Sequence, residues 1–443
     1  MNRRTRRSLL FAGGIGLLFV LACSLWGAAQ RRRDLLGRRL IAALVKHDAA
    51  EALRLIDAGA DPNTPFTPPS PPSLSQWCQY LLHRSPLPVN DSLNAFLIAS
   101  GSDLEGYVSD GPAASRTFPD APELVQAMLQ HGAVLEARDG RRYTPLHLEL
   151  QNNHPRTVRI LIEHGANIHA KDGDNLTPLL LAMAKSKTSP DSILLLLQKG
   201  ADVNARDEDG KTPLILAFEN ELSPEVLRLL LEHHADVNAR DNDGLTPLTW
   251  ASYGAPLTSV RLLLQYGADV QLSDKRGMTP LLGAAFNPDS HVARLLLEHG
   301  ADIKARNHNG ETPLIVAVSD DRAKPETVRL LMAHGADIEA VNRVGDTPLL
   351  AACRYAPASV VRLLIDHGAN VNAQEPYHET ALYLLVLCSA GPEDRKAVEI
   401  IPRLLAHGAD PRVISNHRTA LQFARYARRP DLIAALQRAY WTK

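Results

Sequence analysis

Histidine recurs at one fixed place in this chain, close to the end of an apolar run and, in all but one copy, directly before Gly-Ala. Imidazole nitrogens bind zinc, but a zinc site needs several ligands about 2.0 Å from one ion. Residues that occupy the same place on stacked helices lie roughly 8–10 Å apart, so they cannot share an ion. A histidine at such a place suits the negative end of a helix dipole. The positions are His131, His164, His233, His299, His334, His367 and His407.

The acidic run Asp207-Glu208-Asp209-Gly210 is a second candidate for chemistry, because calcium loops are rich in Asp and contain a Gly. Ala205 occupies the place of the first required carboxylate, and the terminal Glu is absent. We therefore interpret the run as a turn. The sequence also lacks a Gly-rich phosphate loop, a nucleophile elbow and a Cys-x-x-Cys pair. We predict no catalytic residue, no metal site and no cofactor.

The histidines belong to a longer phrase that repeats every 33 to 35 residues and begins with Thr-Pro-Leu. A repeat of this length is a helix pair that cannot bury its own apolar face, so neighbouring copies must stack into a solenoid. Degenerate copies begin at Thr380 and Thr419. The clear copies begin at Thr144, Thr177, Thr212, Thr246, Thr279, Thr312 and Thr347.

Each residue of the repeated phrase has a role in starting or ending a helix. The Thr hydroxyl can accept an unpaired N–H at a helix N-terminus, and Pro is tolerated at the first helical position because its missing donor has no partner there. A second, apolar helix follows, often after a Pro. We expect Gly267, Gly300, Gly335 and Gly368 to end these second helices in the left-handed conformation.

This pattern resembles the ankyrin-repeat family. Asp241, Gly244 and Thr246-Pro247-Leu248, followed by Leu262-Leu263-Leu264 and Gly267-Ala268-Asp269, match the family's order and period. The resemblance implies an all-α solenoid of about twelve stacked helix–turn–helix units with β-turn tips over residues 34–443. His234 departs from the pattern, because it replaces the capping Gly.

The rest of the chain divides around the regular repeats. Prolines in residues 64–72 exclude a helix there, because they lack a donor and bias their predecessors to extended conformations. We expect a basic tail at 1–7, a transmembrane or signal segment at 8–30, a first ankyrin-like repeat at 34–63, a divergent, Pro-rich and loop-rich region at 64–121, regular ankyrin repeats at 122–412, and a capping repeat at 413–443.

The uncharged residues 8–30 are long enough, at about 1.5 Å per helical residue, to cross a hydrocarbon core of about 30 Å. We expect one N-terminal transmembrane helix that anchors the protein in the lipid bilayer. Alternatives are a twin-arginine export signal at Arg6-Arg7, a lipoprotein processed at Cys23, and cleavage after Ala29. Arg31-Arg32-Arg33 favour the uncleaved anchor.

Charge is divided between the tail and the repeats. The chain carries a net charge of −1, and residues 1–39 hold nine Arg against one acid. The remainder is therefore acidic, which gives no electrostatic attraction for nucleic acid. The flanking arginines are nearly balanced across residues 8–30, and we favour repeats outside the cytoplasm, in the periplasm if the source is bacterial. We expect the repeat domain to be monomeric.

The family resemblance implies that ligands contact the turn tips and the ends of the first helices, on the concave side. Leu245, Met278 and Val344 occupy a tip position that should be exposed, and Tyr253 and Phe286 are equivalent positions of adjacent repeats. Exposed aromatic residues in a groove indicate a binding site. Alternatively, the rings pack against neighbouring helices. The candidate partner-binding residues are Leu245, Tyr253, Arg276, Met278, Phe286, Val344, Arg354 and Tyr355.

The sequence therefore predicts a membrane-tethered protein that binds a protein partner through its concave groove and turn tips, as an adaptor, regulator or inhibitor. One alternative is a structural protein that assembles with itself. Another is an enzyme with a site in region 64–121, where Cys78, His83, Asp91 and Asp103 are the residues able to act.

Overall fold

The computed structural model describes residues 32, 34–44, 46, 48–65, 120–185, 188–287, 289–388, 395–415 and 417–440. The chain divides into two compact units, Met1–Glu208 and Asp209–Lys443. Residues 8–30, where the sequence predicts a membrane span, and nearly all of region 64–121 lie outside the described residues. Among the helices that are described, none is long and apolar enough to cross a bilayer.

The first unit is built from helix pairs. A helix at residues 34–44 precedes α2, and the later helices follow after the undescribed residues 66–119. Helix α2 packs on α5, α5 on α7, and α6 on both α7 and α8. The bounds are α2 (Ala49–Asp57), α5 (Pro122–Gln130), α6 (Pro145–Gln151), α7 (Pro155–Glu163), α8 (Pro178–Met183) and α9 (Pro190–Gln198).

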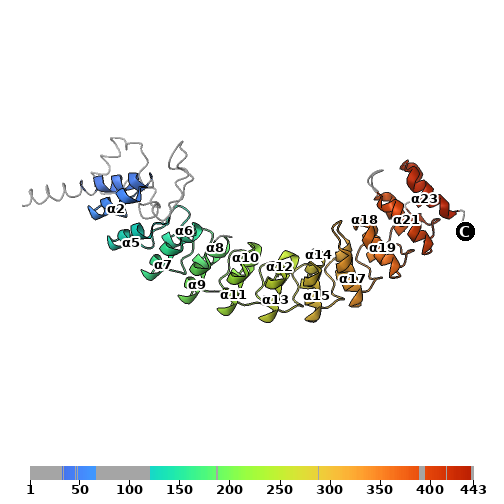
Figure 1. Ribbon diagram of the computed structural model, residues 1–443, viewed down its shortest axis with the longest axis horizontal. Coiled ribbons are helices and arrows are strands. Elements are labelled where there is room, and N and C mark those ends of the chain that lie inside the picture. Colours follow the sequence, from blue (N-terminus) through green and yellow to red (C-terminus); the bar gives the residue numbers. More distant parts are fainter. Residues whose placement is uncertain are drawn as a thin grey trace, which may run out of the picture. The chain divides into compact units, whose positions relative to one another are not determined.

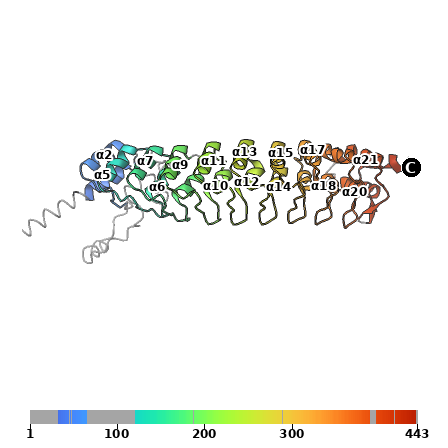
Figure 2. The ribbon, with the colours of Figure 1, turned by 90° about the horizontal axis from the view of Figure 1, so that it is seen from below.

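The second unit stacks seven helix pairs in two layers, with the turn tips projecting beyond the first helices (Figures 1 and 2). The first-helix layer consists of α10 (Pro213–Glu219), α12 (Pro247–Gly254), α14 (Pro280–Phe286), α16 (Pro313–Val318), α18 (Pro348–Tyr355), α20 (Ala381–Leu387) and α22 (Ala420–Tyr426). The second-helix layer consists of α11 (Pro224–Glu232), α13 (Leu257–Gln265), α15 (Ser290–Glu298), α17 (Pro325–Ala333), α19 (Ala358–Asp366), α21 (Lys396–Ala406) and α23 (Pro430–Tyr440).

The stack of helix pairs predicted from the sequence is confirmed, with one departure from an all-α fold. The tip before α22 forms an antiparallel pair of two-residue strands, β1 (Ile414–Ser415) and β2 (Arg418–Thr419), in which Ile414 pairs with Thr419. The pair replaces the usual tip turn at this end of the unit.

The predicted helix ends are also confirmed. Thr279 accepts a hydrogen bond from the backbone N–H of Leu282 at the start of α14. At the other end of the pair, the His299 ring nitrogen Nδ1 lies 2.8 Å from the carbonyl oxygen of Leu295, which also accepts the backbone N–H of His299 at 3.2 Å. The same ring-to-carbonyl contact forms at all seven recurrent histidines, at 2.8–2.9 Å.

The first helices form the core of the stack. In α16, all five residues from Leu314 to Val318 are 3% exposed or less. The neighbouring helices α14, α17 and α18 all pack against α16 and cover it on two sides. The end of each first helix is therefore where its sequence becomes free to meet solvent.

Backbone hydrogen bonds join successive turn tips in the second unit. Each bond runs from an N–H of one tip to a carbonyl oxygen of the tip before it, at 2.8 Å. The tips therefore form one connected edge rather than independent loops. The bonds are Asn242 to Asp209, Lys275 to Asp243, His308 to Arg276, and Arg343 to Asn309.

The capping glycines generate the first prediction. Gly300 has a φ of +84°, and a Cβ added to it would meet nothing within 4 Å, so Gly300→Ala adds backbone strain without a clash. We expect the free energy of unfolding to fall by about 1 kcal/mol, measured by urea or thermal unfolding. Gly254→Ala is the matched control, because its Cβ also enters open space but its φ is not positive. Equal losses for both variants would contradict the cap assignment.

Candidate functional site

Two aromatic rings emerge at the ends of adjacent first helices. Tyr253 and Phe286 each lie seven residues after their capping Thr, and they are 38% and 45% exposed. Both first helices lie in the layer on the concave side of the second unit (Figure 1). The expected exposure of these two residues is confirmed, although about half of each ring is covered.

The covered half of each ring lies against the next first helix. The Tyr253 ring lies against Gly283 of α14, because a Cβ added there would lie 3.7 Å from the Cζ atom of the ring, at ordinary contact distance. The equivalent residue of α16 is Val316, which lines a depression together with Phe286. Each ring is therefore partly exposed and partly packed against a neighbouring helix, although the sequence offered exposure and packing as alternatives.

The two rings and the neighbouring tips enclose a depression of about 370 Å³. Its walls include Tyr253, Arg276, Met278 and Phe286, which are four of the residues predicted from the sequence. Polar tip residues complete the wall: His308, Asn309 and Glu311 occupy tip positions where the family resemblance implies ligand contacts, whereas Asp274 and Asn307 were not predicted. The depression combines an apolar ring surface with a polar edge. It can therefore receive an apolar side chain of a ligand and bind a polar group next to that side chain.

Met278 is buried, at 8% exposed, and the expectation that it would be exposed was wrong. Its sulfur lies 3.5 Å from the amide nitrogen Nδ2 of Asn307 in the next tip, while its own backbone N–H donates to Asp274. The following repeat therefore covers the thioether. Met278 forms the floor of the depression and not an exposed contact.

The remaining tip and helix-end residues lie outside this depression. Val344 and Tyr355 are 63% and 53% exposed, as expected, while Leu245 is only partly exposed. None of the three is among the residues that line the depression around Phe286. The structure brings together Tyr253 of the α12 repeat and the three candidates of the α14 repeat, and it leaves Leu245 and the candidates of the α18 repeat apart.

Arg354 was predicted to contact a partner protein, but in the structure its guanidinium forms ion pairs with acids of the same chain. Its guanidinium lies 2.9 Å from the carboxylate of Glu379 and 3.5 Å from that of Asp346, and only 22% of its side chain is exposed. Burial raises the pKa of Asp346, and the charge of Arg354 opposes this rise. Arg354 therefore neutralises two largely buried acids.

Polar side chains at the ends of other first helices also bond within the chain. Glu219, at the place equivalent to Tyr253, accepts a 2.8 Å hydrogen bond from Lys211. Ser319, at the same place in α16, donates its hydroxyl to the carbonyl of Ile315. Burial and the Asp274 charge raise the pKa of Tyr253 above its ordinary value, and its phenol is protonated and able to donate a hydrogen bond at neutral pH. Among these helix ends, Tyr253 and Phe286 present ring surface for an external contact.

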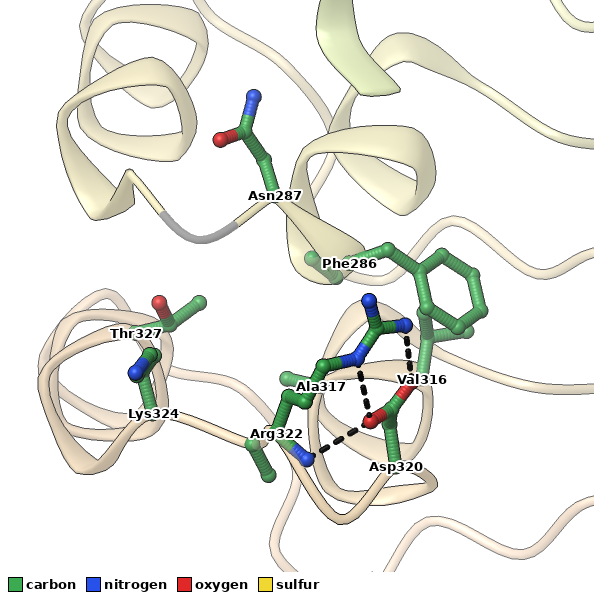
Figure 3. A pocket seen from close by; sticks show the side chains of 10 residues that line it. Phe286, Asn287, Val316, Ala317, Asp320, Arg322, Lys324 and Thr327 are labelled. Atoms are coloured by element: carbon green, nitrogen blue, oxygen red, sulfur yellow. Dashed lines mark hydrogen bonds and ion pairs between the residues drawn. The ribbon is translucent and has the colours of Figure 1, made fainter. Parts of the chain in front are cut away.

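A second depression, of about 220 Å³, was not predicted. It lies between α14, α16 and the loop before α17, and its wall includes Phe286, Val316, Ala317, Arg322 and Lys324 (Figure 3). The sequence signal was the spacing: Thr312 and Thr347 are 35 residues apart, whereas Thr279 and Thr312 are 33 apart. The two extra residues lengthen the loop between α16 and α17.

The first unit contains a buried ionisable pair that was also not predicted. Glu149 in α6 is 2% exposed, and its carboxylate lies 2.7 Å from the Nδ1 atom of His154. Burial raises the pKa of Glu149 to about 7, while the hydrogen bond from His154 lowers it. Burial lowers the pKa of His154, but the bond and charge of Glu149 outweigh this effect and raise it. The pair fastens α6 to the residue that precedes α7.

In the described ranges, no group of three or more His, Cys, Asp or Glu side chains is arranged to hold a metal ion. The residues of the alternative enzyme site, Cys78, His83, Asp91 and Asp103, lie outside the described part of the chain. That alternative stays untested.

A comparison with known protein families agrees with the geometry. The family model described as ankyrin repeats (3 copies) matches residues 113–207, 180–274, 258–342 and 321–410. Among solved structures, the chain is similar to the ankyrin repeat domain of Bcl-3, described as a unique member of the IkappaB protein family. The identity is 33%, the match covers 50% of this chain and 98% of that chain, and the TM-score is 0.43. No curated protein matches the sequence significantly.

The placement of Arg354 generates the second prediction. Arg354→Leu should leave Glu379 and Asp346 without their counter-charge and lower the free energy of unfolding by about 2 kcal/mol, less than for a fully buried pair because some solvent reaches it. Arg343→Leu, at an exposed tip, should change it by less than about 0.5 kcal/mol. Unfolding curves for the two variants that coincide would contradict the structural role of Arg354.

Proposed function

We propose that this chain, which belongs to the ankyrin-repeat family, binds a protein partner across the first-helix layer of its second unit. Ankyrin repeats are protein-interaction modules, and a solenoid of this kind offers an extended surface. The observation that carries the proposal is the pair of half-exposed rings, Tyr253 and Phe286, beside Arg276 in one depression. Aromatic residues and Arg are the side chains that contribute most to protein interfaces.

The surface is suited to binding because it is held in place before a partner arrives. The Arg276 carbonyl accepts the N–H of His308, and Asp274 accepts the N–H groups of Arg276 and Met278 at 2.8 Å. Ordering loops on association costs free energy, and a surface that is already ordered avoids much of this cost. We therefore place the centre of binding on the α12, α14 and α16 repeats.

We also propose that the protein is an adaptor, regulator or inhibitor without a catalytic reaction of its own, and that residues 8–30 tether it to a membrane. The apolar length of that segment and its flanking arginines support the tether. A tethered solenoid would hold its partner near the bilayer. The flanking charges are nearly balanced, and the short N-terminal tail with its export-like Arg6-Arg7 pair supports placement of the repeats outside the cytoplasm.

The third prediction tests the binding surface. Tyr253→Ala with Phe286→Ala should weaken capture of a partner from detergent-solubilised membranes more than tenfold, because buried aromatic anchors typically contribute about 2 kcal/mol or more each. The free energy of unfolding should fall by only about 1–2 kcal/mol, since half of each ring is already exposed. Tyr266→Ala is the control, because this ring is also exposed, at 41%, but ends α13 in the second-helix layer. Equal capture by the double variant and by the control would exclude this surface.

The fourth prediction tests the tether. Full-length protein should remain in the membrane pellet after high-salt and carbonate extraction, whereas a chain that starts at Asp34 should be recovered in the supernatant. Cys23→Ser should leave the result unchanged for a membrane-spanning segment, and should release the protein if the Cys23 thiol carries the lipid. Recovery of the full-length protein in the carbonate supernatant would contradict the anchor.

A further inference from the structure

The depression between α14, α16 and the loop at residues 319–324 lies next to the proposed binding centre. Phe286 lines both this depression and the one at the turn tips, so the ring separates two recesses of the same surface. A partner segment that covers Phe286 therefore meets both recesses.

The size and lining of the loop depression indicate what can fill it. Its volume of about 220 Å³ is below the roughly 300–1,000 Å³ typical of small-molecule and cofactor sites. Ala285, Val316, Ala317 and Ala323 give it apolar walls, and each of these residues is 9% exposed or less. A recess of this size and lining suits one unbranched or γ-branched aliphatic side chain, such as that of Met or Leu.

Acidic and basic side chains at the edges of the two recesses differ in whether they are already bonded within the chain. The acidic side chains Asp320 and Glu311 already accept hydrogen bonds from neighbouring residues. Asp320 accepts from the Arg322 guanidinium at 2.8 and 3.1 Å (Figure 3), which holds the pKa of Asp320 well below its usual range. Glu311 accepts from Asn307 at 2.6 Å.

The neighbouring cations are in the opposite situation. Arg276 lines the tip recess and Lys324 the loop recess, and both are exposed. No ion pair forms on either side chain within the described ranges of the chain. The surface thus presents unused donors on both sides of Phe286, and a carboxylate is the group that complements them.

We propose that the loop depression is the specificity pocket of this surface, and that it receives a Leu or Met side chain from an extended, acidic segment of the partner. Acidic residues on the two sides of that anchor would pair with Arg276 and Lys324. The inference rests on the proposed function, because it names the chemistry of the partner that binds there. It assigns a role to the two residues inserted between α16 and α17, which stacking alone does not require.

The test uses peptides selected from a random display library on the immobilised full-length chain in detergent. The selected peptides should share a Leu or Met near Asp or Glu. Binding of one such peptide is then measured by fluorescence anisotropy. Changing the anchor to Ala should weaken binding at least tenfold, and Ala323→Leu, which fills the pocket, should weaken the unchanged peptide equally. Combining both changes should cause little further loss, because both remove the same contact.

Two matched controls separate the pocket from general effects. Ala255→Leu makes the same change in the loop before α13, outside both recesses, and should bind the peptide normally. Lys324→Glu should weaken the acidic peptide about fivefold and favour a peptide with Lys in place of the acid. Lys304→Glu makes the same charge change at another exposed residue outside both recesses and should have little effect.

The outcomes distinguish the two proposals. If Tyr253→Ala weakens the selected peptides while Ala323→Leu and Lys324→Glu bind them normally, the pocket assignment is wrong and the proposed function stands. Selected peptides that lack an aliphatic residue beside an acid would also overturn the assignment. If neither Tyr253→Ala nor the loop variants affect binding, both proposals fail.

Discussion

The structure depends on one constraint, which is that a single helix pair cannot bury its own apolar face. A first helix inside the stack is therefore covered by the first helices before and after it, as α16 is by α14 and α18, and α16 is buried along its whole length. This burial restricts almost every position of a first helix to a small or apolar residue. The sequence can vary without loss of packing only at the helix ends, the turn tips and the loops, and the two depressions form at these places.

The same stacking explains how residues far apart in sequence form one surface. Phe286 lines a depression together with Val316, which lies in the next repeat. The backbone carbonyl of Arg276 accepts a hydrogen bond from the N–H of His308, also in the next repeat. Each contact crosses about one repeat length. A binding surface built in this way is ordered by the scaffold, and a change in one repeat alters the shape offered by the next.

Most of the fold could be predicted from the sequence because its determinants are local. The capping Thr, the Pro that follows it, the recurrent His and the left-handed Gly each act within one turn of a helix, and the structure confirms these roles. Even at His234 the backbone keeps the left-handed conformation, with a φ of +66°. The strands β1 and β2 were not predicted, because their pairing replaces a turn that the degenerate repeat no longer specifies.

The sequence by itself determined the repeat, its period and the helix ends, because all of these follow from position within one repeat. Only the tertiary structure decided which candidates share a recess. Met278 is covered by Asn307 of the next repeat, and Arg354 is paired with Glu379, which lies 25 residues away. The pocket beside Phe286 exists because a loop two residues longer folds against a neighbouring helix end. Burial and charge pairing between repeats depend on which side chains the stack brings together, and the pattern within one repeat does not contain that information.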